Sequence, residues 1–160
     1  MQPPLTITLP SDCEIAVTRT FRASADLVFD CWTVPALIKR WLGFADWTFT
    51  TCEFDARVGG KWRFVTRSPD GFEMGSGGDV LEITRPDWIK TDELYDQDWT
   101  GGKTIVTNRI TEEDGITTSL VTILYPTRQA RDGARATPMA EGMEAGFKRL
   151  EELLADMPAY

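Results

Sequence analysis

The sequence predicts an α+β domain in which a curved antiparallel sheet of about seven strands packs around a long C-terminal helix, with two short helices after the first strand. Between residues 47 and 125, short segments of alternating apolar and polar residues are separated by Gly, Pro and Asp, which is typical of consecutive strands joined by tight turns. Residues 137–157 instead repeat apolar side chains at steps of three and four, which is typical of an amphipathic helix.

The chain before residue 47 is expected to carry the first strand and the two short helices. Residues 1–12 are punctuated by proline and are interpreted as an N-terminal extension, which leaves residues 13–160 as a single domain. The apolar alternation of residues 13–21 predicts the first strand. Ser24 is a suitable N-cap for one short helix, and Pro35 is suited to the first turn of the next.

The central part of the chain predicts six further strands. They are expected at residues 47–54, 61–66, 72–83, 88–95, 103–111 and 116–125. Two turns between them have the residues that hairpins favour, Pro-Asp-Gly at 69–71 and Glu-Asp-Gly at 113–115. Successive hairpins of this kind indicate an antiparallel meander.

The last predicted element is the long helix, for which Thr137 is the expected N-cap and Pro138 the first helical residue. One face of this helix is apolar and must lie on the sheet. Its apolar stripe comprises Met139, Met143, Phe147, Leu150, Leu154 and Met157. A curved sheet holding such a helix is a helix-grip arrangement, which can enclose a pocket.

The composition excludes several classes of function. With 25 acidic and 17 basic residues, the chain has a formal charge of −8, which would repel phosphate backbones, so nucleic acid is not an expected partner. The N-terminal residues lack a basic and apolar leader, and no apolar stretch is long enough to span a bilayer, so we expect a cytoplasmic protein. Three widely spaced cysteines fit packed thiols in a reducing compartment.

The chain contains no histidine, which excludes a His-based triad, imidazole acid–base chemistry and His-containing metal sites. No metal, cofactor or recognisable catalytic set is predicted. Residues 101–104 (Gly-Gly-Lys-Thr) resemble the end of a phosphate-binding loop, but the first glycine of that motif is replaced by Gln97. The glycine-rich residues 75–78 lie within a strand pattern and indicate a bulge or a close backbone approach.

The aromatic residues are the strongest signal for a binding site. Six tryptophans provide more ring surface than a two-layer core of this size needs, although a large core is the competing interpretation. Trp62 and Phe64 alternate with charged or small neighbours and should both face the helix. The residues expected to line a cavity are Trp32, Trp41, Trp62, Phe64, Met74, Met143 and Phe147. Arg63 and Glu73 are possible polar anchors if the facing of their strands permits it.

Several separated patches of the chain resemble one protein family. They comprise Trp32-Thr33, Pro35, Arg40-Trp41 and Gly43, residues 55–64, 69–71 and 81–83 with Pro86, residues 99–102, residues 125–126 with 130–132, and residues 142–150. This string resembles the homologues of the activator of the heat-shock 90 ATPase, a branch of the START-like (SRPBCC, Bet v 1-like) superfamily. Leu42 departs from the pattern, because many members carry a second tryptophan there. The resemblance implies the helix-grip fold, an internal hydrophobic pocket and a link to the stress response.

Three functions remain open. The leading hypothesis is reversible binding of a hydrophobic or amphipathic small molecule. The second is a protein-interaction module whose partner is a chaperone or a second copy of the chain, as in a homodimer. The third is a cyclase-like or dehydratase-like enzyme, which would need a tyrosine such as Tyr95 or Tyr125, or a cavity carboxylate, with a shifted pKa. Glu73, Asp92 and Glu93 are the carboxylates on predicted strands, and their facing is open.

Overall fold

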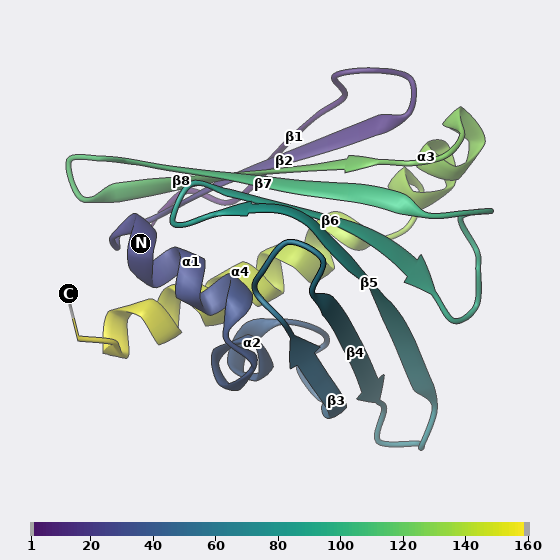
Figure 1. The fold of residues 1–160 in the computed structure, drawn as a ribbon, viewed down its shortest axis with the longest axis horizontal. Helices are drawn as coiled ribbons and strands as arrows, with labels where there is room; N and C mark the ends of the chain where they lie inside the picture. The colour runs from purple at the N-terminus through teal and green to yellow at the C-terminus, as the bar shows by residue number, and fades with distance from the viewer. Residues whose placement is uncertain (1, 159–160) are drawn as a thin grey trace.

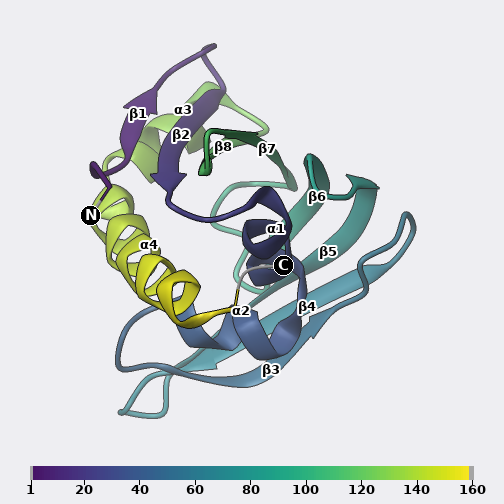
Figure 2. The same ribbon diagram turned by 90° about the vertical axis from the view of Figure 1, so that its left-hand side faces the viewer.

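The computed structural model describes residues 2–158, in which an eight-stranded antiparallel sheet curves around the helices (Figures 1 and 2). The strand order is β1-β2-β8-β7-β6-β5-β4-β3. The strands are β1 (Thr6–Thr8), β2 (Glu14–Phe21), β3 (Thr48–Phe54), β4 (Lys61–Arg67), β5 (Glu73–Thr84), β6 (Trp88–Tyr95), β7 (Thr104–Glu113) and β8 (Ile116–Leu124). The helices are α1 (Ala25–Thr33), α2 (Pro35–Trp41), α3 (Arg128–Arg135) and α4 (Met139–Asp156). The predicted α+β class and helix-grip arrangement are confirmed.

The additional strand comes from the region that we interpreted as an extension. β1 pairs with β2 through Thr6 opposite Thr18, and Leu5 and Ile7 pack against the core. The Leu5 amide also donates to Glu144 Oε1 on α4 at 2.9 Å. Residues 5–8 are therefore integrated into the sheet and the core.

The two short helices form for the reasons that their sequences indicate. The Ser24 side chain accepts a hydrogen bond from the Leu27 amide and caps α1, and Pro35 occupies the first turn of α2. At the β7–β8 hairpin, Asp114 (φ 53°) and Gly115 (φ 78°) both have positive φ, as a tight type I′ turn requires. Local sequence therefore determines these connections.

The start of the long helix differs from the prediction. Thr137 does not cap α4, because its hydroxyl donates to the Ala134 carbonyl at 2.6 Å and so closes the end of α3. Pro138 is the N-cap instead, with non-helical dihedrals, and the helix begins at Met139. The polar segment before α4, for which an irregular or briefly helical structure is expected from the sequence, is the short helix α3.

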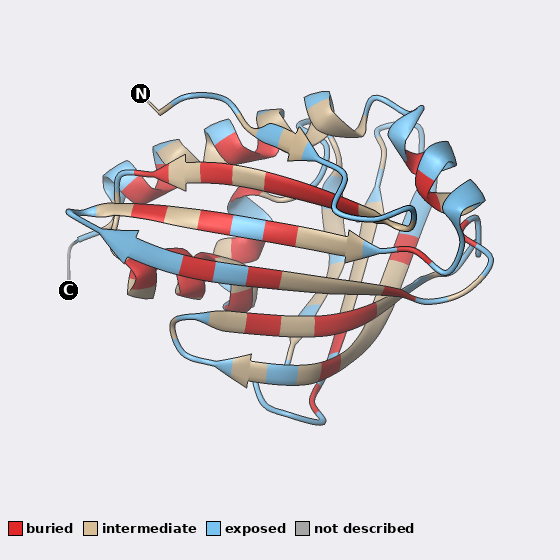
Figure 3. Cartoon of the chain, turned by 90° about the horizontal axis from the view of Figure 1, so that it is seen from above, coloured by how far each residue is buried: buried red, intermediate tan, exposed pale blue. Residues whose placement is uncertain are grey.

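The tightly packed core lies at one side of the molecule, between β2, β7, β8, α1 and α4. Its fully buried side chains include Ile15 and Val17 on β2, Val28 on α1, and Phe147 and Leu150 on α4. Figure 3 shows buried residues alternating with more exposed ones along the central strands, as expected for a sheet with one covered face. β3, β4 and β5 bend away from this core around α2 (Figure 2). No helix within residues 2–158 combines the length and apolarity needed to cross a bilayer.

Candidate ligand-binding site

A cavity of about 320 Å³ lies beneath the bent part of the sheet, and its lining is mainly aromatic and aliphatic. This volume is at the lower end of the range of about 300 to 1,000 Å³ that is usual for small-molecule sites. The lining residues are Trp32, Ile38, Trp41, Leu42, Gly43, Phe49, Phe54, Trp62, Phe64, Thr66, Met74, Ser76, Ile89, Thr91, Glu93, Tyr95, Val106, Asn108 and Val121. They come from α1, α2, the residues just after α2, and strands β3 to β8.

Two pairs of rings form much of the apolar wall. The Trp32 and Trp41 rings meet edge to face with centroids 4.8 Å apart, and the Trp62 and Phe64 centroids are also 4.8 Å apart. The indole N–H of Trp41 donates to the Cys31 carbonyl at 2.8 Å, and that of Trp62 donates to the Asp92 carbonyl at 3.0 Å. These bonds fix both indoles, so part of the wall is formed in advance of any ligand.

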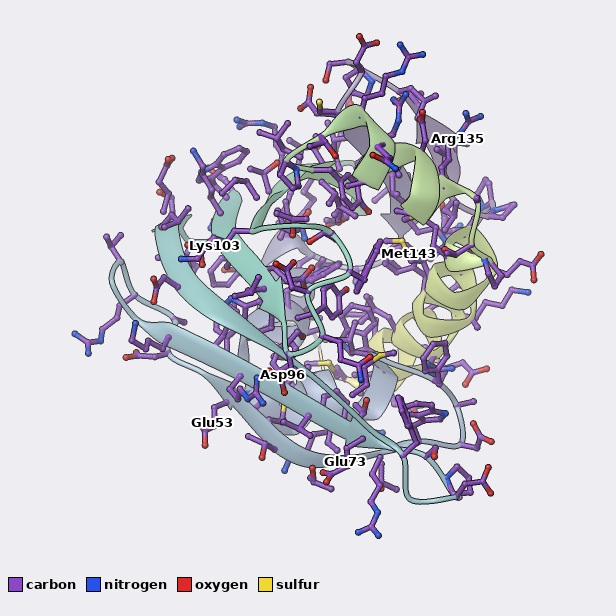
Figure 4. All side chains as sticks on the ribbon, turned by 90° about the vertical axis from the view of Figure 1, so that its right-hand side faces the viewer. Glu53, Glu73, Asp96, Lys103, Arg135 and Met143 are labelled. Atoms are coloured by element: carbon purple, nitrogen blue, oxygen red, sulfur yellow. The ribbon has the colours of Figure 1, made fainter. Side chains whose placement is uncertain are left out.

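The structure brings five of the seven predicted lining residues together around the cavity, namely Trp32, Trp41, Trp62, Phe64 and Met74. Phe147 and Met143 are not among the lining residues. Phe147 is 2% exposed and stacks on Trp41 with centroids 6.2 Å apart, so it supports the wall from behind. Met143 packs against the core on α4 (Figure 4).

The order of the layers explains why these two residues of α4 do not line the cavity. α2 lies between α4 and the cavity, and the Trp41 carbonyl lies so close to Gly146 on α4 that a side-chain carbon there would be 3.3 Å away. The helical wall of the cavity is therefore made by α1 and α2, whereas we expected the C-terminal helix in this position.

The facing of the strands excludes the two polar anchors that we considered. Arg63 lies on the outer face of β4, where its guanidinium forms two hydrogen bonds of 2.7 Å with Asp96. Glu73 is exposed, and Figure 4 shows Glu53 and Glu73 extending from the sheet away from α4. Neither Arg63 nor Glu73 lines the cavity.

Of the three strand carboxylates, Glu93 faces the cavity. Thr91, Glu93 and Tyr95 alternate along β6 and all belong to the lining, while the Asp92 carboxylate accepts from the Asp79 amide at 2.7 Å on the other face. The Thr104 hydroxyl lies 3.4 Å from Glu93 Oε1. The alternation of side chains along β6 predicts that Glu93 and Asp92 face opposite sides of the sheet, but it does not predict which side faces the cavity.

Burial sets the protonation behaviour of this polar end. Desolvation raises the pKa of Glu93 by more than hydrogen bonds from Thr104 and Tyr95 lower it. Desolvation, together with the Glu93 charge, also raises the pKa of Tyr95, and the same two causes raise that of Tyr125 to about 12. In all three groups, burial shifts the equilibrium toward the uncharged form.

Asn108 is a second polar residue of the lining, and the prediction did not include it. It is 3% exposed, and its Oδ1 accepts from the Ser119 hydroxyl at 2.7 Å. Its Nδ2 has no hydrogen-bond partner among the described residues, and the same is true of Trp32 Nε1. Buried donors without partners are uncommon in proteins.

The remaining chemistry of the site is limited. Within residues 2–158, no lysine or arginine lines the cavity, and no group of three or more His, Cys, Asp or Glu residues could hold a metal ion. Burial raises the pKa of the Cys31 thiol to about 12 and also raises that of Cys52. Both therefore favour the unreactive thiol form.

Residues 22–155 match the family described as "Activator of Hsp90 ATPase homolog 1-like protein". The chain belongs to this family. The predicted resemblance to this branch of the START-like superfamily is confirmed.

Solved structures show the same fold. A protein from Rhodobacter sphaeroides is 32% identical, with a TM-score of 0.92 over 97% of this chain and 100% of that one. A Staphylococcus epidermidis protein is 26% identical, with a TM-score of 0.83 over 97% and 96% of the two chains. Protein Ms6760 from Mycobacterium smegmatis is 18% identical with a TM-score of 0.83, over 97% and 99%. No match was found among curated proteins.

Proposed function

We propose that this protein reversibly binds a hydrophobic or amphipathic small molecule in the cavity between strands β3–β8 and the helices α1 and α2. The observation that carries the proposal is the cavity of about 320 Å³ with Trp32, Trp41, Trp62 and Phe64 in its wall. An apolar molecule that enters it gains about 25 cal/mol for each Å² of apolar surface removed from water.

A pair of matched variants tests this proposal. Val106 lines the cavity, whereas Thr107 follows it on the opposite face of β7. Val106→Phe fills the cavity and should abolish binding of biphenyl, measured by tryptophan fluorescence and thermal shift. Thr107→Phe should leave binding unchanged. Overpacking costs about 1 to 3 kcal/mol, so thermal unfolding of both variants is measured to check that they remain folded. The proposal fails if the wild-type protein does not bind biphenyl, or if Val106→Phe binds it as well as the wild type does.

Glu93 favours a second candidate function, which is acid–base catalysis on the bound molecule. A carboxyl group with a raised pKa beside the Tyr95 hydroxyl in a cavity is suited to proton transfer. In a dehydration, the Glu93 carboxylate would remove a proton next to a carbonyl, a C=C bond would form as the C–O bond breaks, and the proton held by Glu93 would pass to the departing hydroxyl, which leaves as water. Conversion of 4-hydroxy-4-phenylbutan-2-one to the enone, followed by absorbance, tests this. Equal rates for the wild type and Glu93→Gln would rule out Glu93 as the catalyst.

The exposed aromatic cluster favours the protein-interaction alternative. Phe44 and Phe72 are each about half exposed, and their rings flank Trp47 with centroids 5.2 and 6.1 Å away. Such a cluster is suited to an apolar partner surface. If the partner is the Hsp90 chaperone, as the family description suggests, the protein should increase the chaperone's ATPase rate, and Phe72→Ser should reduce that increase. An unchanged ATPase rate would argue against this partner.

A further inference from the structure

We infer that the cavity takes an elongated, uncharged ligand with a hydrogen-bond donor at the end near Glu93 and an acceptor at the end near Asn108, and that it rejects carboxylates. This inference rests on the proposed binding function and adds the chemical class of the ligand. It is carried by the positions of the two polar side chains and by the absence of cationic side chains of residues 2–158 from the lining.

The register of the sheet separates the two polar groups. Asn108 on β7 lies opposite Ile89 on β6, whereas Thr104 lies opposite Glu93. Four residues therefore separate the two positions along the ladder, which corresponds to about 13 Å at 3.3 Å per residue. Both side chains line the cavity, so a ligand that reaches both of them must be elongated.

The end near Asn108 lacks an acceptor. Asn108 Oδ1 already accepts a hydrogen bond from the Ser119 hydroxyl, and Asn108 Nδ2 has no partner among residues 2–158. As oriented, the free atom is the N–H donor, and the side chain is almost completely buried. Leaving such a buried donor unpaired is unfavourable. A ligand carbonyl at this end would remove that cost.

The end near Glu93 offers an acceptor. The titratable groups that face this carboxyl are Tyr95 on β6 and Tyr125 just after β8. Lys103 instead contacts Asp92, with the ammonium 3.5 Å from its carboxylate. Since no cationic side chain among the described residues faces it, Glu93 can accept a hydrogen bond from a ligand hydroxyl or N–H group.

The same arrangement disfavours charged ligands. A carboxylate in the cavity would lose its hydration, find no lysine or arginine, and share the space with Glu93. A ligand ammonium group would be stabilised only by an ionised Glu93, and burial opposes that ionisation. Between the two ends the lining is mainly apolar, for example Trp62 and Val106, which suits a flat apolar body.

Matched biphenyl probes test this assignment. The full probe is 4′-hydroxybiphenyl-4-carboxamide. Biphenyl-4-carboxamide lacks the hydroxyl, 4-phenylphenol lacks the amide, and 4′-hydroxybiphenyl-4-carboxylic acid carries a charge at pH 7. Dissociation constants come from tryptophan fluorescence titrations. Loss of either end group should weaken binding about tenfold, since a net hydrogen bond of about 1.4 kcal/mol corresponds to that factor. The carboxylic acid should bind at least about tenfold more weakly than the full probe.

Variants of Asn108 and Glu93 test which end of the probe each residue contacts. Asn108→Leu should make the full probe and 4-phenylphenol bind equally, because the amide loses its partner. Glu93→Leu should remove the advantage of the hydroxyl, and Glu93→Gln, which keeps an acceptor oxygen, should restore it. Glu53→Gln on the exposed outer face is the control and should change nothing. Thermal unfolding checks that each variant is folded.

The outcomes separate this inference from the proposed function. If biphenyl binds but the end groups have no effect, or the carboxylic acid binds as tightly as the carboxamide, the assignment of the ligand class is overturned and the binding function stands. If neither biphenyl nor any derivative binds, both are overturned.

Discussion

The two halves of the sheet have similar apolar patterns, but one half covers a filled core and the other borders a cavity. On β2, side chains such as Ile15 and Val17 are buried beneath α1 and α4, and the space is filled. On β4, Trp62 and Phe64 alternate in the same way, yet one side of their wall borders a cavity. The difference lies in what covers each half: α4 packs directly on the first, while α2 holds it away from the second. Apolar periodicity thus specifies which side chains face inward, and the position of the covering helix decides whether the space is filled.

The largest expected effect is the difference in stability lost when one phenylalanine of each half is replaced by alanine. Phe147→Ala should lower the free energy of unfolding by about 3 to 5 kcal/mol, because Phe147 is buried against Phe21, Trp32 and Trp41. Phe64→Ala should cost about 1 to 2 kcal/mol, because its ring already has fewer packing partners on the cavity side. Urea denaturation measures both. Equal costs would contradict the view that the two halves differ in packing.

The second effect concerns the charged pair that joins the filled half to α4. Arg19 is 2% exposed and forms two hydrogen bonds of 3.1 Å with Glu144. Arg19→Met should cost about 3 kcal/mol, because it leaves a partly buried carboxylate without its partner. The double variant with Glu144→Gln should recover part of the loss. Urea denaturation of the single and double variants tests this, and additive losses would show that the two residues are not coupled.

This pair also predicts how acid affects the filled half. Burial acts to raise the pKa of Glu144, but hydrogen bonds from Arg19 and the Leu5 amide, together with the Arg19 charge, hold it below its ordinary value of 4.5. The stability that the pair contributes is therefore present above about pH 4.5 and is lost as the pH falls through the lowered pKa.

Glu93 in the cavity half should show the opposite dependence. Its folded pKa is raised above 4.5, so its contribution to stability is complete below that pH and is lost as the pH rises through the folded pKa. Glu93→Gln should thus be more stable than the wild type at pH 8, with a smaller difference at pH 4. Tyr95 and Tyr125 also have raised pKa values and stay uncharged across this window. Thermal unfolding at both pH values tests this, with Glu53→Gln as the control, and a difference that does not change with pH would contradict it.

The smallest effect concerns the unpaired donor. Replacing Asn108 by Leu and Ser119 by Ala removes both partners of a buried hydrogen bond and the unpaired N–H group together. The double variant should be as stable as the wild type or more stable by up to about 1 kcal/mol. A loss above about 2 kcal/mol in urea denaturation would show that Asn108 is needed for the fold rather than for a ligand.

Much of this arrangement follows from local sequence, and the rest depends on the tertiary structure. The alternation around Trp62 and the hairpin residues Asp114 and Gly115 sufficed to predict their strands and turn. The roles of Phe147 and Thr137 could not be predicted, since they depend on how α4 lies relative to α2 and α3. The period of two along β6 puts Glu93 and Asp92 on opposite faces, but only the assembled sheet shows which face is covered.

The glycine-rich stretch of β5 limits which of its positions can accept a larger side chain. A side-chain carbon at Gly78 would lie 2.1 Å from the Asp92 carbonyl, so the predicted close backbone approach is present and this position must stay small. Ser76, two residues earlier, lies opposite Phe64 and lines the cavity. Exchanging Ser76 for Ala, Val or Leu would change the free volume in steps while the filled half remains untouched. One position on β5 can therefore set the size of the molecule that fits, separately from the stability of the fold.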